Sequence, residues 1–308
     1  MLALRLGVPV VNTFHGMPPG RIGFPHRLRD IPSFLRQRTM LPANRLLSRI
    51  NLTHSVAVSA PVAEAYIAWL GLSPDSMTVI HNGLPASAYA APDPAQSAAL
   101  RAELNLDGRS PVLIAVARLV EGKGHALLLD TLAQLVPHHP DTLLLLAGDG
   151  PLRPALEDNA AERGLGRHIR FLGTRSDVTA LLAVSDILVS ASAFEGFGLA
   201  VLEGMAQGLP VVALDLPALR SFIDDGDNGI LVRYLQPAAL AAAIRKLLAD
   251  PATAAQIGHN ARQRAEAFSI EASAAGYEAL YRDLISHAAP APKPTVSTPA
   301  RMNRAPKP

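Results

Sequence analysis

The larger, C-terminal part of the sequence alternates short apolar runs with longer amphipathic segments, and this pattern constrains the fold most. The short runs are rich in leucine and β-branched residues, whereas the longer segments carry apolar residues at helical spacing. Strands that are apolar on both faces are typical of parallel sheets covered by helices. The pattern therefore predicts a doubly wound α/β domain. Its strands are expected at 112–117, 143–147, 169–172, 187–190, 211–214 and 229–232, and its helices at 125–135, 152–163, 177–183, 199–206 and 237–248.

The first hundred residues repeat this alternation with fewer units. Strands are expected at 8–12, 53–58 and 78–81, with one helix at 61–70. An alanine- and proline-rich stretch at 85–93 and a helix at 95–104 follow. About 90 residues with three strands make a thin α/β domain for its size class. We therefore expect the first domain to be incomplete.

The length of 308 residues agrees with two domains. We predict a partial domain at 1–90, a linker at 91–110, a second domain at 111–270 and a C-terminal helix at 271–287. Residues 288–308 hold six prolines and four cations, with no acid and no aromatic side chain. Such a segment buries too little apolar surface to fold, so we expect a disordered tail.

Charge and composition exclude several classes of protein. Without the four cations of the expected tail, 24 Lys and Arg residues face 26 Asp and Glu residues, which argues against a protein that binds nucleic acid. The sequence has no cysteine, which excludes disulfides, thiolate metal sites and thiol nucleophiles and fits a reducing compartment. Neither a run of about 20 apolar residues nor a secretory signal is visible. The sequence predicts a cytoplasmic protein, at most peripheral at the inner membrane face.

Common nucleotide-binding and hydrolase signatures are missing from the sequence. The GDG at 148–150 and the GFG at 196–198 each lack the third glycine of the dinucleotide fingerprint. The GKG at 122–124 lacks the spacing of a P-loop. HExxH and GxSxG do not occur. A nicotinamide dehydrogenase, a P-loop NTPase, a zincin and an α/β-hydrolase are therefore disfavoured.

Two cations follow the first predicted strand of the second domain. Arg118 comes directly after that strand, and Lys123 comes just before the next predicted helix. Parallel α/β sheets bind ligands at the carboxyl ends of their strands, and two cations there suit a diphosphate. A solvated loop is the alternative interpretation.

Two acids flank a glycine-rich turn before the helix predicted at 199–206. Gly196 and Gly198 permit close backbone approach, and the free N–H groups of a helix N-terminus favour an anion. The carboxylates of Glu195 and Glu203 are suited to accept hydrogen bonds from sugar hydroxyls beside that anion. The alternatives are a surface acid at Glu195 and a carboxylate stabilised by the helix dipole at Glu203.

Together these segments resemble the family 4 retaining glycosyltransferases, which have the GT-B fold. The donor domain of that family is resembled by VARLVEGKG at 116–124, LAGDGP at 146–151, FLG at 171–173, EGFG at 195–198 with Glu203, and DGDNGILV at 225–232. Its acceptor domain is resembled by VVNTFHG at 10–16, VAVS at 56–59 and VIHNG at 79–83. The resemblance extends over nearly all of residues 8–286.

The resemblance implies two Rossmann-like domains, an incomplete acceptor-side domain at 1–90 and a nucleotide-sugar donor domain at 111–270. It implies a retaining enzyme of polysaccharide biosynthesis that moves a hexosyl or similar group from a nucleotide-diphosphate sugar to a glycan or lipid-linked acceptor. The nucleotide sugar is then a co-substrate, and neither a cofactor nor a metal is expected, since fixed cations stabilise the leaving diphosphate. The resemblance implies that Arg118 and Lys123 bind the diphosphate and that Glu203 binds the ribose. It implies that Glu195 and the backbone of Phe197, Gly198 and Leu199 bind the sugar, and that His15 and Glu195 are catalytic.

Two departures from the family pattern stand out. DLPALRS at 215–221 replaces the Gly-Gly and glutamate of many members, and the segments that precede the histidine strand in the family have no counterpart here. We therefore expect residues 1–90 to be marginally stable and a protease-resistant core to begin within 95–111. Two other functions stay open, namely a non-catalytic nucleotide-sugar-binding remnant and a nucleotide-sugar epimerase.

An arginine-rich segment lies between the first two predicted strands. From Arg21 to Arg49 it holds seven arginines and one acid, Asp30, interleaved with apolar side chains. Basic amphipathic segments are drawn to anionic lipid surfaces. The segment predicts contact with an anionic membrane or a phosphate-bearing lipid-linked acceptor, and the alternative is a solvated arginine face on a packed helix.

Overall fold

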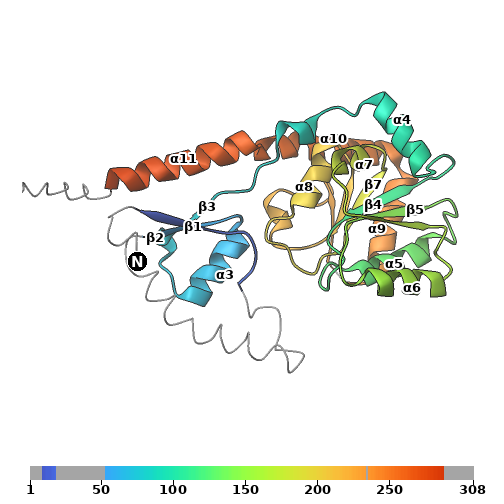
Figure 1. Ribbon diagram of the computed structural model, residues 1–308, viewed down its shortest axis with the longest axis horizontal. Coiled ribbons are helices and arrows are strands. Elements are labelled where there is room, and N and C mark those ends of the chain that lie inside the picture. The colour runs from blue at the N-terminus through green and yellow to red at the C-terminus, as the bar shows by residue number, and fades with distance from the viewer. Residues whose placement is uncertain (1–8, 19–52, 234, 288–308) are drawn as a thin grey trace, which may run out of the picture.

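The computed structural model describes residues 9–18, 53–233 and 235–287, which form two lobes, each built on a parallel sheet (Figure 1). The first lobe holds the three-stranded sheet, in the order β1-β2-β3. One helix, α3, connects β2 to β3 and is followed by the short 3₁₀ helix η2. The bounds are β1 (Val10–Phe14), β2 (Thr53–Ala57), α3 (Ala60–Leu70), η2 (Pro74–Ser76) and β3 (Met77–Val79).

The second lobe holds six parallel strands in the order β6-β5-β4-β7-β8-β9. The chain begins at β4 in the middle, proceeds outward to β6, and then returns to place β7 on the other side of β4. The order of strands therefore reverses between β4 and β7, and the crevice at their carboxyl ends is where such sheets bind ligands. The bounds are β4 (Val112–Val116), β5 (Leu143–Ala147), β6 (Ile169–Gly173), β7 (Ile187–Ser190), β8 (Val211–Leu214) and β9 (Ile230–Val232).

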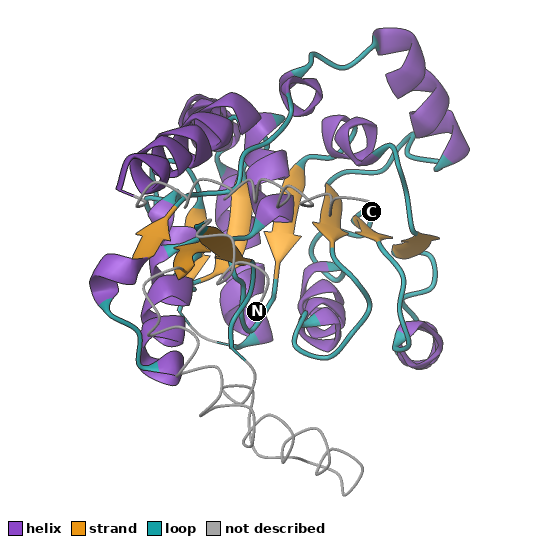
Figure 2. Cartoon of the chain, turned by 60° about the vertical axis from the view of Figure 1, so that its left-hand side comes forward, coloured by secondary structure: helices purple, strands orange, loops and turns teal. Residues whose placement is uncertain are grey.

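Helices cover both faces of this sheet (Figures 1 and 2). Successive residues of a strand point to opposite faces. Accordingly Val112 and Ile114 of β4 pack in the core with α7, α8 and α10, whereas Leu113 and Ala115 pack in the core with α5, α6 and α9. The bounds are α4 (Pro94–Glu103), α5 (His125–Leu135), α6 (Arg153–Glu162), α7 (Val178–Ala183), α8 (Leu199–Ala206), α9 (Pro237–Ala249) and α10 (Pro251–Ala265), with 3₁₀ helices η3 (Ala86–Tyr89), η4 (Leu219–Ser221) and η5 (Glu266–Phe268).

The chain crosses between the lobes twice, and the two crossings contact each other. Leu84 donates its N–H to the Phe268 carbonyl at 2.8 Å, and Ile270 donates to the Leu84 carbonyl at 2.9 Å. The final helix α11 (Ile270–His287) then returns to the first lobe (Figure 1). There the Tyr277 hydroxyl lies 3.2 Å from Thr13 Oγ1 of β1. Segments from both ends of the described chain thus complete the first lobe.

The predicted doubly wound α/β fold is confirmed, and every strand and helix expected in the second lobe ends within a residue or two of its observed bounds. The first predicted strand is displaced, because 8–12 was expected and Val10–Phe14 is observed. β1 pairs with β2 in parallel register from Val10 opposite Thr53 to Phe14 opposite Ala57. Phe14 also stacks on Tyr66 of α3 with the ring centroids 3.8 Å apart, and this tertiary contact extends the strand beyond the apolar run.

Two of the sequence-based predictions lie outside the described residues. These are the arginine-rich segment from Arg21 to Arg49 and the proline-rich tail at 288–308. Within the described ranges, none of the helices combines the length and the apolar character needed to span a membrane.

Candidate functional site

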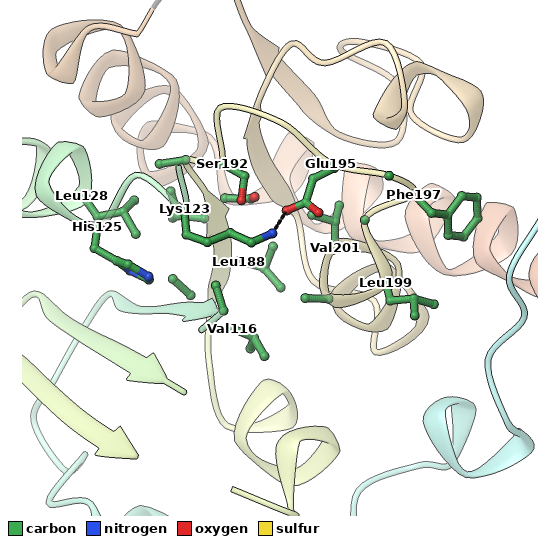
Figure 3. Close-up of a pocket in the computed structure, with 18 of the residues that line it drawn as sticks. Val116, Lys123, His125, Leu128, Leu188, Ser192, Glu195, Phe197, Leu199 and Val201 are labelled. Carbon is green, nitrogen blue, oxygen red and sulfur yellow. Dashed lines mark hydrogen bonds and ion pairs between the residues drawn. The ribbon is translucent and has the colours of Figure 1, made fainter. Parts of the chain in front are cut away.

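A cavity of about 290 Å³ opens where the order of strands reverses, at the carboxyl ends of β4 and β7 (Figure 3). The second lobe supplies most of its wall from the ends of these strands, the loop after each and the first turn of α8. The first lobe adds His15, just after β1, and Asn82, just after β3. The cavity therefore lies between the lobes, at the position that the sheet topology favours for a ligand.

Lys123 and Glu195 meet inside this cavity. Lys123 Nζ donates to Glu195 Oε1 at 2.6 Å, and the two side chains are 21% and 18% exposed. The sticks in Figure 3 show Lys123 extending toward Glu195, with the dashed line marking this ion pair. The loops after β4 and β7 thus place a cation and an anion side by side, although 72 residues separate them in the sequence.

Gly124 allows these two loops to approach each other. It has φ +71° and precedes α5, and a Cβ at this position would lie 1.9 Å from the Ala191 carbonyl oxygen after β7. A side chain here is therefore excluded both by the left-handed backbone and by the neighbouring loop. The ion pair depends on this close contact.

The N-terminus of α8 forms another part of the cavity wall. Gly198 precedes the helix at φ +99°. Among the described residues, no acceptor meets the backbone N–H groups of residues 197–200. Free N–H groups at a helix N-terminus, together with the helix dipole, attract an anion. The cavity thus offers an ammonium and a cluster of N–H donors to one negatively charged group.

Phe197 contributes to this wall through its backbone. Its side chain is 2% exposed and packs in an aromatic cluster at the junction of the lobes, 5.3 Å from Phe222 and 5.4 Å from His81, centroid to centroid. In Figure 3 the ring points away from Lys123 and Glu195. Leu199, by contrast, is 41% exposed at the start of α8.

Ser59 joins the two lobes beside the cavity. It precedes α3, where a serine normally caps the helix, but its hydroxyl makes no capping bond and instead donates to the Gly196 carbonyl at 2.6 Å. Gly196 also packs so closely on the first lobe that a Cβ would lie 2.3 Å from the His15 carbonyl oxygen. The loop at 195–198 is therefore fixed by Ser59 and by the backbone of His15.

Replacing Ser59 with alanine should loosen this loop. We expect a loss of about 1 kcal/mol in the free energy of unfolding, the net value of one hydrogen bond, and weaker binding of inorganic pyrophosphate in a calorimetric titration. Ser185→Ala is the matched control. Ser185 Oγ donates to the Leu181 carbonyl at a distance of 2.8 Å, and this hydrogen bond lies outside the cavity wall. Pyrophosphate affinity that is equal in both variants and the wild type would show that Ser59 does not position the loop.

The structure separates the two cations that the sequence grouped together. Lys123 lines the cavity, whereas the Arg118 side chain is exposed and does not belong to its wall. The Arg118 carbonyl accepts a hydrogen bond from His125 Nε2 at 2.9 Å. The backbone of Arg118 is therefore fixed near the cavity, although the residue is exposed.

Glu203 lies on the second turn of α8 and does not line the cavity. Its carboxylate makes no hydrogen bond or ion pair within the described residues, and burial raises the pKa of this carboxyl above its ordinary value. Without a partner, the charged form is disfavoured in the folded chain.

Replacing Glu203 with glutamine should therefore stabilise the chain at neutral pH. Because the folded-state pKa of Glu203 is raised, its carboxyl contributes fully to the stability of the folded chain below the unfolded-state pKa of about 4.3. As the pH rises through the folded-state pKa, the carboxyl ionises and this contribution is lost, whereas a glutamine stays neutral. The stabilisation should be larger at pH 7 than at pH 4, as measured by urea unfolding at both. Glu162→Gln, at an exposed position of α6, is the control. An effect of Glu203→Gln that does not vary with pH would contradict this account.

The polar residues of the cavity wall that sequence reasoning did not single out include Asn82, Ser192 and His125. His125 is 3% exposed, and its Nδ1 has no hydrogen-bond partner within the described residues. Burial lowers the pKa of its imidazole, and the bond to the Arg118 carbonyl opposes this shift only in part. The sequence signal for all three is their position just beyond a predicted strand or at the start of a helix.

The described residues contain no group of three or more His, Asp or Glu side chains placed to hold a metal ion. The cavity wall offers one ammonium, one carboxylate, two imidazoles, one carboxamide, hydroxyls and free N–H groups. Such a set suits a ligand that carries both an anionic group and hydroxyls.

Comparisons with known proteins agree with this chemistry. The sequence profile described as "Glycosyl transferases group 1" matches residues 96–264, and "Glycosyltransferase Family 4" matches residues 1–87. D-inositol 3-phosphate glycosyltransferase of Corynebacterium glutamicum is 33% identical over 222 residues, which cover 70% of this chain and 53% of that protein. Alpha-D-kanosaminyltransferase of Streptomyces kanamyceticus is 31% identical over 62% of this chain and 50% of its own length. This chain thus spans about half the length of these relatives.

Other matches cover a larger share of both chains. D-inositol 3-phosphate glycosyltransferase of Frankia alni is 30% identical over 94% of this chain and 72% of its own length. The crystal structure of Anabaena Alr3699/HepE with UDP and glucose superposes with a TM-score of 0.76 at 26% identity, covering 88% of this chain and 71% of that one. WaaG, a glycosyltransferase of lipopolysaccharide biosynthesis, has the same fold, with a TM-score of 0.76 at 20% identity over 90% of this chain and 76% of its own. Since the group 1 profile matches more than half of the sequence, the chain belongs to the glycosyl transferases group 1 and has the GT-B fold.

Proposed function

We propose that this chain binds a nucleoside-diphosphate sugar in the cavity between its lobes and transfers the sugar, with retention of anomeric configuration, to a glycan or lipid-linked acceptor. The observation that carries the proposal is the convergence of Lys123 with the free N–H groups before α8 in one cavity. This arrangement accepts a diphosphate, and it occurs where a doubly wound sheet binds its ligand.

The proposed roles follow from position. Negative charge grows on the diphosphate as its bond to the sugar lengthens, and Lys123 with the α8 N-terminus stabilises that charge where it develops. Glu195 lies beside Lys123 and accepts hydrogen bonds from sugar hydroxyls. His15 reaches the cavity from the first lobe and faces the sugar. No metal ion is required in this scheme, because the cation and the helix N-terminus supply the positive charge.

Two further residues are assigned to the edge of the site. We assign Glu203 to the ribose hydroxyls and Arg118 to the outer end of the diphosphate, which its exposed side chain reaches by turning toward the cavity. The solved structures of Anabaena HepE with UDP and with UDP-glucose support a UDP-sugar as the first donor to test.

The proposal also assigns a role to each part of the chain. Residues 1–90 form the acceptor side, 91–110 the linker, 111–270 the donor side, and 271–287 the helix that returns to the acceptor side. We assign the reaction to the cytoplasm, at the inner membrane face, with the arginine-rich segment as the contact with anionic lipid. Sedimentation with anionic vesicles tests this contact, which should weaken as salt rises.

The decisive experiment combines binding with turnover. The full chain is titrated with UDP, dTDP, GDP and ADP, and then incubated with the matching radiolabelled nucleotide sugars and glycan or lipid-linked acceptors. We expect one nucleotide to bind and its sugar to be transferred, with the anomeric configuration read by NMR. Binding without transfer would favour the non-catalytic remnant, and interconversion of free donors would favour the epimerase. Failure to bind all four nucleotides would overturn the proposal.

A further inference from the structure

The two charged side chains of the cavity bind each other in the structure, although the proposed function gives them different parts of one ligand. Lys123 is assigned to the diphosphate and Glu195 to the sugar, yet their charged atoms lie 2.6 Å apart. Both are about four-fifths buried. Because water screens a pair in this setting less than it screens a surface pair, the interaction is strong enough to compete with a ligand.

We propose that Glu195 makes the site specific for a sugar-bearing nucleotide by competing with the diphosphate for Lys123. The inference rests on the proposed function. A diphosphate can reach the Lys123 ammonium fully only if the Glu195 carboxylate moves away or shares the cation. A carboxylate that stays in place repels the phosphate oxygens at short range.

The cost of separating this pair depends on what the ligand offers in return. Lys123 is the side-chain partner of Glu195 within the described residues, so a displaced carboxylate needs new hydrogen-bond donors. A nucleotide sugar brings hydroxyls that donate to Glu195 while its diphosphate takes Lys123. A free nucleoside diphosphate takes Lys123 and leaves a largely buried carboxylate unpaired beside it.

The same competition acts after transfer. Once the sugar has left, Glu195 loses its hydroxyl donors and regains its attraction to Lys123, which weakens the hold on the remaining nucleoside diphosphate. The ion pair therefore disfavours the product relative to the donor, and no other group needs to move for this to happen. A glutamate at this position does more than contact the sugar, because its charge sets the ratio of the two affinities.

The test measures the affinities of the full chain for UDP and for UDP-glucose by calorimetry, or for the pair that the nucleotide panel selects. We expect Glu195→Gln to bind UDP about three- to tenfold more tightly than the wild type, because it removes the competing charge. Its affinity for UDP-glucose should stay equal or fall. The preference for the sugar-bearing ligand should therefore decrease by at least the same factor.

Asp215→Asn is the matched control. Asp215 Oδ1 also accepts a hydrogen bond at 2.6 Å, from Arg220 Nε, but this pair does not line the cavity. The control should leave both affinities unchanged. A Lys123→Met background distinguishes competition for the ammonium from direct repulsion between Glu195 and the diphosphate. If the two compete, the gain in UDP affinity from Glu195→Gln should shrink when the ammonium is absent.

UDP binding by Glu195→Gln that is no tighter than in the wild type would overturn the inference. Thermal melts check that the variant is folded, and Glu195→Ala, which should shift UDP affinity in the same direction, serves if glutamine disrupts the loop. The proposed function fails separately, since a wild-type chain that binds none of the nucleotides would contradict it before any variant is made.

Discussion

Replacing Lys123 with alanine should weaken UDP binding about 10- to 150-fold, the loss of one hydrogen bond to a charged group worth about 1.5–3 kcal/mol. The diphosphate loses the ammonium that lines the cavity and that stabilises its negative charge. The measurement is a calorimetric titration of the full chain.

Two substitutions define the comparison for Lys123→Ala. Lys246→Ala removes an exposed cation from α9, outside the cavity wall, and should leave UDP affinity unchanged. Arg118→Ala should weaken binding by a smaller factor than Lys123→Ala, because the guanidinium is exposed and outside the wall of the cavity. Unchanged UDP affinity in Lys123→Ala would refute the diphosphate role of this residue.

Replacing Gly124 with alanine should cost about 2–5 kcal/mol of the free energy of unfolding and abolish UDP binding. A non-glycine residue in the left-handed region costs about 1–2 kcal/mol, and overpacking against a rigid neighbour adds about 1–3 kcal/mol. The neighbour here is backbone, the Ala191 carbonyl oxygen, which lies 1.9 Å from the added Cβ position. To relieve the clash, the loops that carry Lys123 and Glu195 must separate.

Gly164→Ala is the control that separates the cost of a left-handed backbone from the cost of steric overlap. Gly164 has φ +69°, close to the +71° of Gly124, but nothing lies within 4 Å of an added Cβ. Urea unfolding of both variants should therefore show only the left-handed penalty at Gly164 and a larger loss at Gly124. Equal losses would mean that the contact between the two loops is not under steric constraint.

The local pattern of the sequence was sufficient to predict the second lobe. Its strands are continuously apolar because both faces of the sheet are covered, and its helices keep one apolar face toward that sheet, so each element carries its own signal. The sequence also predicted that the motifs at 118–123 and 195–198 follow strands of one parallel sheet, whereas the strand order that makes β4 and β7 neighbours was known only from the structure. Their meeting at one edge is a property of that topology.

The tertiary structure decided the direction and the partner of each side chain. Periodicity does not distinguish the exposed Arg118 from the inward Lys123, and it does not show that Phe197 turns its ring into an aromatic cluster while its N–H stays free. Ser59 directly precedes α3, yet its hydroxyl makes no capping bond and instead donates to the Gly196 carbonyl, 137 residues away in the chain. Local sequence signals arise from backbone geometry and burial. Contacts between loops 72 or 137 residues apart exist only in the folded structure. The ion pair of Lys123 with Glu195 forms because β4 and β7 are neighbours in one sheet, and the bond from Ser59 to Gly196 forms because the two lobes pack together.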